Sequence, residues 1–138
     1  MTEMVKAYVS IPMSGHDLRM QCDKAEMIRK AAQELMPEAI IITPFDVAGE
    51  QVSDISYADA MGKDVRELLS CRFIIAAEGW NESKGCRDEM FIALNHGIHP
   101  LIAVYREGRW DVEEFDTISM QAVWPPRPAG DNDGKESV

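Results

Sequence analysis

The chain has 138 residues, of which 46% are hydrophobic and 28% are charged, and its formal net charge is −10. This length and composition predict one folded domain around a single core. The negative charge argues against a generic nucleic-acid-binding protein, which usually carries a basic surface, so we expect no polymeric nucleic acid as a partner. A small anionic ligand is compatible with it, because a few backbone N–H groups can hold one phosphate.

The chain contains three cysteines and three histidines: Cys22, Cys71, Cys86, His16, His96 and His99. The cysteines form no C-x-x-C pair and the histidines lack metal-ligand spacing, so we expect no disulfide framework, no metal and no cofactor. The first residues, MTEMVKAYVSI, lack the apolar run of a signal peptide, and no stretch approaches the roughly 18 apolar residues of a membrane span. We therefore expect a reducing, cytoplasmic location and no membrane partner.

The apolar pattern of the first half predicts two strands and a helix. Residues 5–11 form a short, largely apolar run that is typical of a buried strand. Apolar residues recur at helical spacing over residues 17–36, and residues 39–43 form the second strand. A proline follows each of these elements and ends it. Residues 45–55 are mixed and polar, and we expect a loop there.

In order, the second half is expected to form a helix over residues 56–71, a strand over 73–77, a helix over 83–96 and a strand over 100–105. A further short helix is expected over residues 111–119, with Asp111 as its N-cap. Residues 125–138, PPRPAGDNDGKESV, are rich in proline, glycine and charge, and we expect a disordered tail. The folded domain is then residues 1–124.

This order of strands and helices predicts an α/β fold, a Rossmann-like (flavodoxin-like) doubly wound parallel sheet of four to five strands in a single domain. Helices should cover both faces of the sheet. In such folds ligands bind at the carboxyl ends of the strands. The expected site is therefore formed by the loop over residues 11–15, the turn over residues 43–46 and the loop over residues 78–83.

Two carboxylates occupy positions where a helix should bury apolar surface. Asp64 lies four residues before Leu68, and Glu89 lies three residues after Cys86 and four before Ala93. Side chains at these spacings share one helix face, so both carboxylates are expected to face inward beside the strand over residues 73–77. An inward carboxylate must be paired, hydrogen-bonded or used in chemistry.

Each carboxylate also has a structural interpretation. Glu89 could be an acid near a helix N-terminus, where the helix dipole favours it. Asp64 could be a partner of Arg66, of Arg72 or of a backbone N–H group. The two acids together favour an enzyme, since a protein that only binds a ligand would not need both.

Two segments, AYVSIPMSG (7–15) and KDVRELLSCRFIIAAEGWNESKGCRDEMFIALNHG (63–97), resemble the nucleoside 2-deoxyribosyltransferase superfamily. The resemblance covers roughly residues 4–105. It is strongest to the branch of 2′-deoxynucleoside 5′-monophosphate N-glycosidases and related uncharacterised bacterial and phage proteins. It implies cleavage of the bond between a nucleobase and C1′ of the sugar.

The resemblance implies three catalytic roles. By position, Glu89 matches the glutamate that attacks C1′ and forms a glycosyl-enzyme ester. Asp64 matches the aspartate that contacts the leaving base and assists its protonation, and Tyr8 matches the tyrosine that orients the nucleophile. These residue types suit the chemistry, because a carboxylate stabilises and traps an oxocarbenium-like centre, and a carboxyl with a raised pKa protonates a leaving group.

The resemblance also bears on the substrate. Transferases that act on free nucleosides carry an aspartate six residues before the nucleophile, whereas this chain has Ser83 there, as the monophosphate hydrolases do. A serine hydroxyl beside a helix N-terminus favours a 5′-phosphate, and Ser83 is also a good N-cap. The family's first loop often has an arginine where this chain has Ser14, so Lys84 or Arg87 would have to compensate. The other substrate-binding residues implied are Ser10, Pro12, Met13, Ser14, Gly15, Gly79, Trp80, Gly85 and Ser119.

Two of these residues have structural alternatives. Trp80 either stacks on a base or covers the core, and Tyr8 could be an ordinary core residue.

In the family, a neighbouring subunit completes the active site from the segment after the fourth strand, here residues 116–124. This predicts a homodimer or higher homo-oligomer with Ser119 in a shared site. The expected function is hydrolysis of a (deoxy)nucleoside 5′-monophosphate, with base exchange or a non-catalytic nucleotide-binding module as alternatives.

Overall fold

The computed structural model of the chain describes residues 4–13, 15–48 and 57–116. Its strands are β1 (Lys6–Ser10), β2 (Ile40–Ile42), β3 (Phe73–Ala77), β4 (His99–Arg106) and β5 (Arg109–Glu114). Its helices are α1 (Leu18–Leu35), α2 (Pro44–Ala48), α3 (Tyr57–Leu68), the 3-10 helix η2 (Trp80–Glu82) and α4 (Lys84–Asn95).

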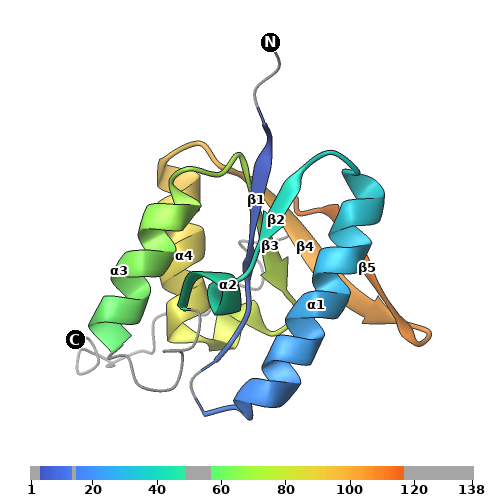
Figure 1. Cartoon of the computed structure of the whole chain (residues 1–138), viewed down its shortest axis with the longest axis horizontal. Coiled ribbons are helices and arrows are strands. Elements are labelled where there is room, and N and C mark those ends of the chain that lie inside the picture. Colours follow the sequence, from blue (N-terminus) through green and yellow to red (C-terminus); the bar gives the residue numbers. More distant parts are fainter. Residues whose placement is uncertain (1–3, 14, 49–56, 117–138) are drawn as a thin grey trace.

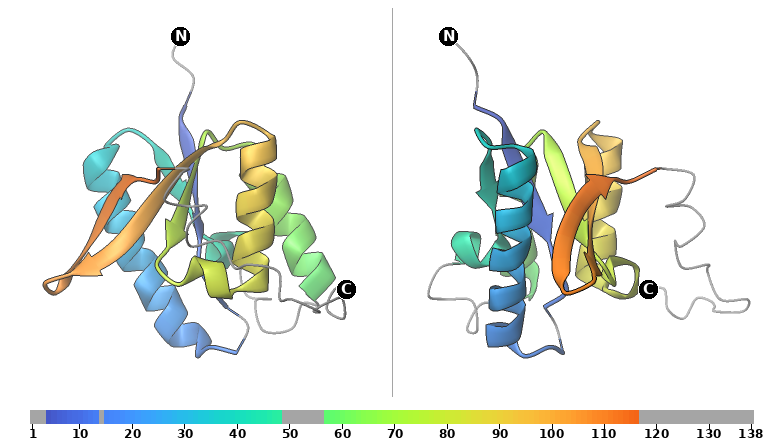
Figure 2. Two further views of the ribbon diagram at one scale, coloured as in Figure 1. Left: turned by 180° about the vertical axis from the view of Figure 1, so that it is seen from behind. Right: turned by 90° about the vertical axis from the view of Figure 1, so that its right-hand side faces the viewer.

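The five strands form one mixed sheet in the order β2-β1-β3-β4-β5. The first four strands are parallel, and β5 runs antiparallel to β4. Helix α1 lies on one face of the sheet, and α3 and α4 lie on the other (Figures 1 and 2). The prediction of a single α/β domain with helices on both faces is confirmed. In this strand order the chain leaves β1 and β3 toward opposite faces, which opens a crevice between their carboxyl ends.

The side chains of strand β1 alternate between the two faces of the sheet, so this strand contributes to the hydrophobic cluster on each face. Ala7 and Val9 are fully buried in the cluster formed with α1, whereas Tyr8 belongs to the cluster formed with α3 and α4. Ser10 points to the same face as Tyr8, since residues two apart in a strand share a face. The central strand therefore presents a tyrosine and a serine to the layer that holds Asp64 and Glu89.

The helix predicted over residues 111–119 is wrong for the part that the structure describes. Residues 109–114 form β5, which pairs with β4 through a tight turn at Glu107 and Gly108, both with positive φ (52° and 84°). Trp110 and Val112 alternate with polar residues and pack on the cluster around α1, so the apolar period is two, as in a strand. Residues 117–119 lie outside the described part, as does the predicted tail over residues 125–138.

The other boundaries differ by small amounts. The loop predicted over residues 45–55 begins with the short helix α2, and residues 49–55 lie outside the described part. Helices α1 and α4 both have polar N-caps: Asp17 accepts from the N–H groups of Arg19 and Met20, and Ser83 Oγ accepts from Cys86 N at 3.2 Å. The predicted N-cap at Ser83 is therefore confirmed, and it fixes where α4 begins.

Candidate active site

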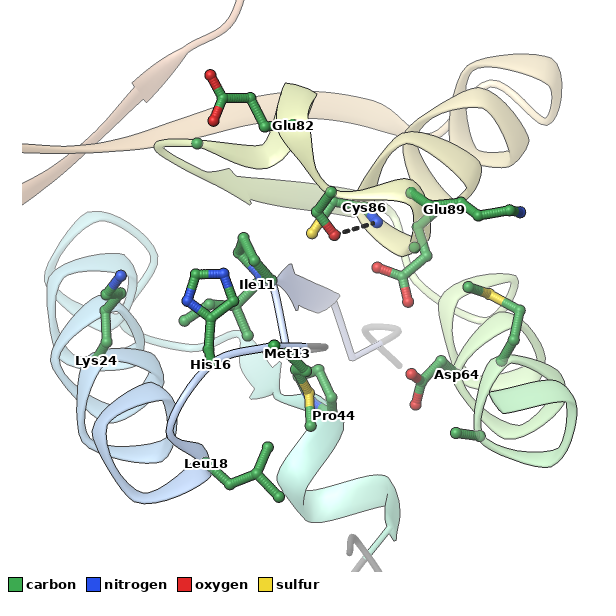
Figure 3. A pocket seen from close by; sticks show the side chains of 18 of the residues that line it. Ile11, Met13, His16, Leu18, Lys24, Pro44, Asp64, Glu82, Cys86 and Glu89 are labelled. Carbon is green, nitrogen blue, oxygen red and sulfur yellow. Dashed lines mark hydrogen bonds between the residues drawn. The ribbon is translucent and has the colours of Figure 1, made fainter. Parts of the chain in front are cut away.

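A pocket of about 950 Å³ lies at the carboxyl ends of β1 and β3 (Figure 3). The loop after β1, the loop after β3, the first turns of α4 and one face of α3 line it. Eight of the residues predicted from the sequence line this pocket: Pro12, Met13, Gly15, Asp64, Gly79, Ser83, Gly85 and Glu89. The structure therefore brings these eight residues together at one pocket, whereas Tyr8, Ser10 and Trp80 do not line it.

Glu89 is a buried carboxyl that the sheet holds at both oxygens. Its side chain lies on the buried face of α4, with Cys86, Met90 and Ala93, and the residue is only 4% exposed. Tyr8 Oη donates to Oε2 at 3.0 Å, and Ser10 Oγ donates to Oε1 at 2.6 Å. Each oxygen thus has one donor on the sheet side, and the carboxyl group lines the pocket on its other side.

Asp64 faces Glu89 from helix α3. Figure 3 shows the two carboxyl groups on the same side of the pocket, one reaching from α4 and the other from α3. Asp64 is partly buried and lines the pocket. The inward orientation predicted for both acids is therefore what the structure has, although they come from different helices and lie 25 residues apart in the sequence.

Burial makes both carboxyls weaker acids. It raises the pKa of Glu89 to about 8, with a further increase from the charge of Asp64, while the hydrogen bonds from Ser10 and Tyr8 act in the opposite direction. Burial likewise raises the pKa of Asp64 to about 6, and the Tyr8 hydroxyl opposes this. The pair therefore holds a single proton between about pH 6 and pH 8, and this proton belongs to both carboxyls together.

Tyr8 and Cys86 remain neutral beside this pair. Tyr8 is completely buried, and burial followed by the charge of Glu89 raises the pKa of its hydroxyl well above the usual value of a tyrosine. Burial also raises the pKa of the Cys86 thiol to about 12, so this cysteine is a poor nucleophile. The acid–base chemistry of this corner of the pocket therefore rests on Asp64 and Glu89.

The loop after β1 is attached to α1 by Gln21, a residue that no sequence pattern singles out. Gln21 is 4% exposed, and its Nε2 donates to the carbonyl oxygen of Pro12 at 2.5 Å. Gly15 has a φ of 79°, a conformation that favours glycine. The loop thus places Pro12, Met13 and Gly15 against the pocket, whereas Ser14 lies outside the described residues.

The loop after β3 reaches the pocket through a glycine and the start of α4. Gly79 has a φ of 93°, and Ser83 and Gly85 line the pocket at the N-terminus of α4. Trp80 does not line it: the indole is 2% exposed and packs edge-on against Phe115, with ring centroids 5.8 Å apart. Of the two roles considered for Trp80, the structure favours covering the core.

Two cationic or polar side chains on the opposite wall were not predicted as site residues. Figure 3 shows His16 and Lys24 across the pocket from the pair formed by Asp64 and Glu89. Neither side chain forms an ion pair or hydrogen bond within residues 4–13, 15–48 and 57–116. Sequence spacing offers a weak signal for Lys24 only, since it lies three residues after Gln21 and shares its helix face.

Metal and membrane features are absent from the part of the chain that the structure describes. No group of three or more His, Cys, Asp or Glu side chains there could hold a metal ion. No described helix combines the length and the apolar character needed to cross a bilayer. Ser119 lies outside the described residues, so its position relative to the pocket stays a prediction.

The fold is similar to that of a 2-deoxyribosyltransferase from the psychrotolerant bacterium Bacillus psychrosaccharolyticus, a biocatalyst for the synthesis of antiviral and antitumoral nucleosides. The TM-score is 0.56, the sequence identity is 11%, and the match covers 83% of this chain and 79% of that chain. No protein-family model and no curated protein matches the sequence. At this identity the similarity establishes the fold alone.

Proposed function

We propose that the protein is an N-glycoside hydrolase that cleaves the base–sugar bond of a (deoxy)nucleoside 5′-monophosphate. The observation that carries the proposal is Glu89, a buried carboxyl held at both oxygens and lining the pocket on the same side as Asp64. A carboxyl so fixed is suited to attack on a sugar carbon, and a second carboxyl with a raised pKa is suited to protonate the departing base.

The reaction has two steps. In the first, a Glu89 oxygen bonds to C1′ while the bond from C1′ to the base breaks, and Asp64 gives its proton to the base. In the second, Asp64 takes a proton from water, the hydroxide bonds to C1′, and the ester to Glu89 breaks. The reactive form is the singly protonated pair with its proton on Asp64. Burial favours the proton on Glu89, the more buried acid, and the donors Tyr8 and Ser10 oppose this because they stabilise the Glu89 carboxylate.

The pocket contains groups that support binding of a phosphate. Ser83 and the N-terminus of α4 offer a hydroxyl and a positive helix end. Lys84 lines the pocket but pairs with Asp88 at 2.9 Å, and Arg87 donates to the Asn81 carbonyl oxygen and does not line it. The side chains better placed to replace the missing loop arginine are therefore on the opposite wall, where His16 and Lys24 lie (Figure 3).

Cleavage is tested by incubating the protein with a panel of nucleoside 5′-monophosphates and nucleosides and measuring released base by chromatography. Release of base from the monophosphates supports the proposal. A thermal shift on nucleotide addition without any released base would instead identify a nucleotide-binding module.

Substitution of Ser83 by aspartate is expected to reverse much of the preference for a phosphorylated substrate. The new charge would repel the phosphate dianion and lower kcat/KM for the monophosphate by about 100-fold, while the value for the free nucleoside changes little. Ser83→Asn is the matched control, since asparagine caps the helix equally well without a charge. A wild-type protein that prefers free nucleosides would contradict the hydrolase proposal.

Base exchange between nucleosides is the second candidate, because the similar solved structure is that of a 2-deoxyribosyltransferase. In this reaction a second base, in place of water, attacks C1′ of the ester on Glu89. Adding a free base to the assay separates the two: a transferase forms a new nucleoside, whereas a hydrolase releases the sugar phosphate at an unchanged rate.

We also propose that the protein forms a homodimer or a larger assembly in which Ser119 of one subunit completes the site of another. Light scattering is expected to report an assembly at micromolar concentration. Mixing the Glu89→Gln variant with the Ser119→Ala variant and allowing their subunits to exchange should restore activity. One site of each mixed dimer then has both wild-type residues. An active monomer, or mixing without recovery, would refute the shared site.

A further inference from the structure

We infer that Ser10 is a positioning residue that, together with Tyr8, holds the Glu89 carboxylate in its attacking orientation. The sequence resemblance had implied contact with substrate. Ser10 is 1% exposed, is not among the residues that line the pocket, and donates to Oε1 of Glu89 at 2.6 Å. It lies behind the nucleophile, on the side away from the pocket.

The geometry of β1 explains why a pair of donors is needed. The terminal torsion of a glutamate is broad, so a single hydrogen bond would leave the carboxylate free to swing. Tyr8 and Ser10 lie two residues apart on one face of β1, and each holds a different oxygen of Glu89. Strand β1 pairs with strands on both sides, with Tyr8 opposite Ile42 and Ile74, so the donors sit on a rigid support.

The surroundings of Ser10 direct its hydroxyl toward Glu89. Ser10 also interacts with the Cys86 thiol, whose pKa is raised to about 12 by burial, so this neighbour stays neutral. A charged acceptor forms the stronger hydrogen bond. Loss of the Ser10 hydroxyl would leave Oε1 without its donor on a side where Ser10 is only 1% exposed, and the carboxylate would be disfavoured.

The first test needs no catalytic activity. We expect NMR titration of protein labelled with 13C at the glutamate carboxyls to show a higher midpoint for Glu89 in Ser10→Ala than in the wild type, with Glu89→Gln identifying the resonance. Ser70→Ala is the control, because it removes an exposed serine that bonds to Lys6 and Glu67 instead. An unchanged Glu89 midpoint in Ser10→Ala would overturn the inference.

The second test rests on the proposed function. Ser10→Ala should lower kcat at pH 7 by about 10- to 100-fold with little change in KM, and the acid limb of the pH profile should move to higher pH. Ser10→Thr, which keeps the hydroxyl, should recover most of the rate. A raised KM with an unmoved pH profile would instead show that Ser10 contacts substrate. If no nucleotide is cleaved at all, the proposed function fails while the titration still decides the role of Ser10.

Discussion

Replacing Glu89 by glutamine is expected to lower the cleavage rate by at least about three orders of magnitude, because loss of a covalent nucleophile removes the main path to the product. The measurement is release of base in single-turnover assays with purified protein. Asp88→Asn is the matched control: it removes the neighbouring carboxylate on the same helix, which pairs with Lys84, and should retain activity. A Glu89→Gln variant with a tenth of the wild-type rate would show that the nucleophile is another group.

The same variant should fold at least as well as the wild type, which separates chemistry from stability. Burial raises the pKa of Glu89 from 4.5 to about 8, so the folded state binds this proton more tightly than the unfolded state. Wild-type stability should therefore fall as the pH rises from about 4.5 to about 8. Glu89→Gln lacks this dependence. The difference between its melting temperature and that of the wild type should therefore increase as the pH rises through that range.

Replacing Asp64 by asparagine is expected to slow cleavage by about 10²- to 10⁴-fold for substrates with poor leaving bases, because proton delivery to the base is lost. A substrate with an activated leaving base should recover much of the rate. Glu67→Gln, one turn along α3 and paired with Lys6, is the control and should retain activity. An equal loss on good and poor leaving bases would show that Asp64 has a structural role.

The pH profile gives an independent check on the same pair. For the wild type, kcat/KM should be bell-shaped with limbs near pH 6 and pH 8, since the active pair holds one proton. Asp64→Asn should lose the alkaline limb. Its remaining acid limb reports the ionisation of Glu89 alone and should not move to lower pH, because Asp64 is protonated and uncharged on the acid limb of the wild type. A profile that Asp64→Asn leaves unchanged would contradict the shared proton.

The central part of the fold could be predicted because its sequence signals are local. The strand over residues 73–77 has the predicted bounds, and the helices that carry Asp64 and Glu89 follow from apolar residues three and four apart. The strand over residues 109–114 was not predicted because only two of its residues, Trp110 and Val112, are apolar and pack on the core. Two apolar residues among polar ones are a weak signal for a strand. Its pairing with β4 is a tertiary contact, which propensity does not reveal.

The candidate site was predictable in its carboxylates and loops but not in its supporting contacts. An acid on an apolar helix face is visible in the sequence, so Asp64 and Glu89 could be named. The contacts of Ser10 with Glu89 and of Gln21 with the Pro12 carbonyl join segments whose spacing carries no signal. Trp80 shows the same limit, because its packing on Phe115 decides that the indole is buried.

The side chains of β1 alternate between the two faces of the sheet, so the register of this strand decides both whether the core packs and whether Glu89 has its donors. A slip of one residue in the pairing of this strand would turn Tyr8 and Ser10 toward α1 and present Ala7 and Val9 to Glu89. The slipped molecule would bury two polar side chains among aliphatic ones and leave a buried carboxyl with no donors, so it would be both unstable and inert. Specific activity in a refolding experiment should therefore report the fraction of molecules in which the central strand has found its register.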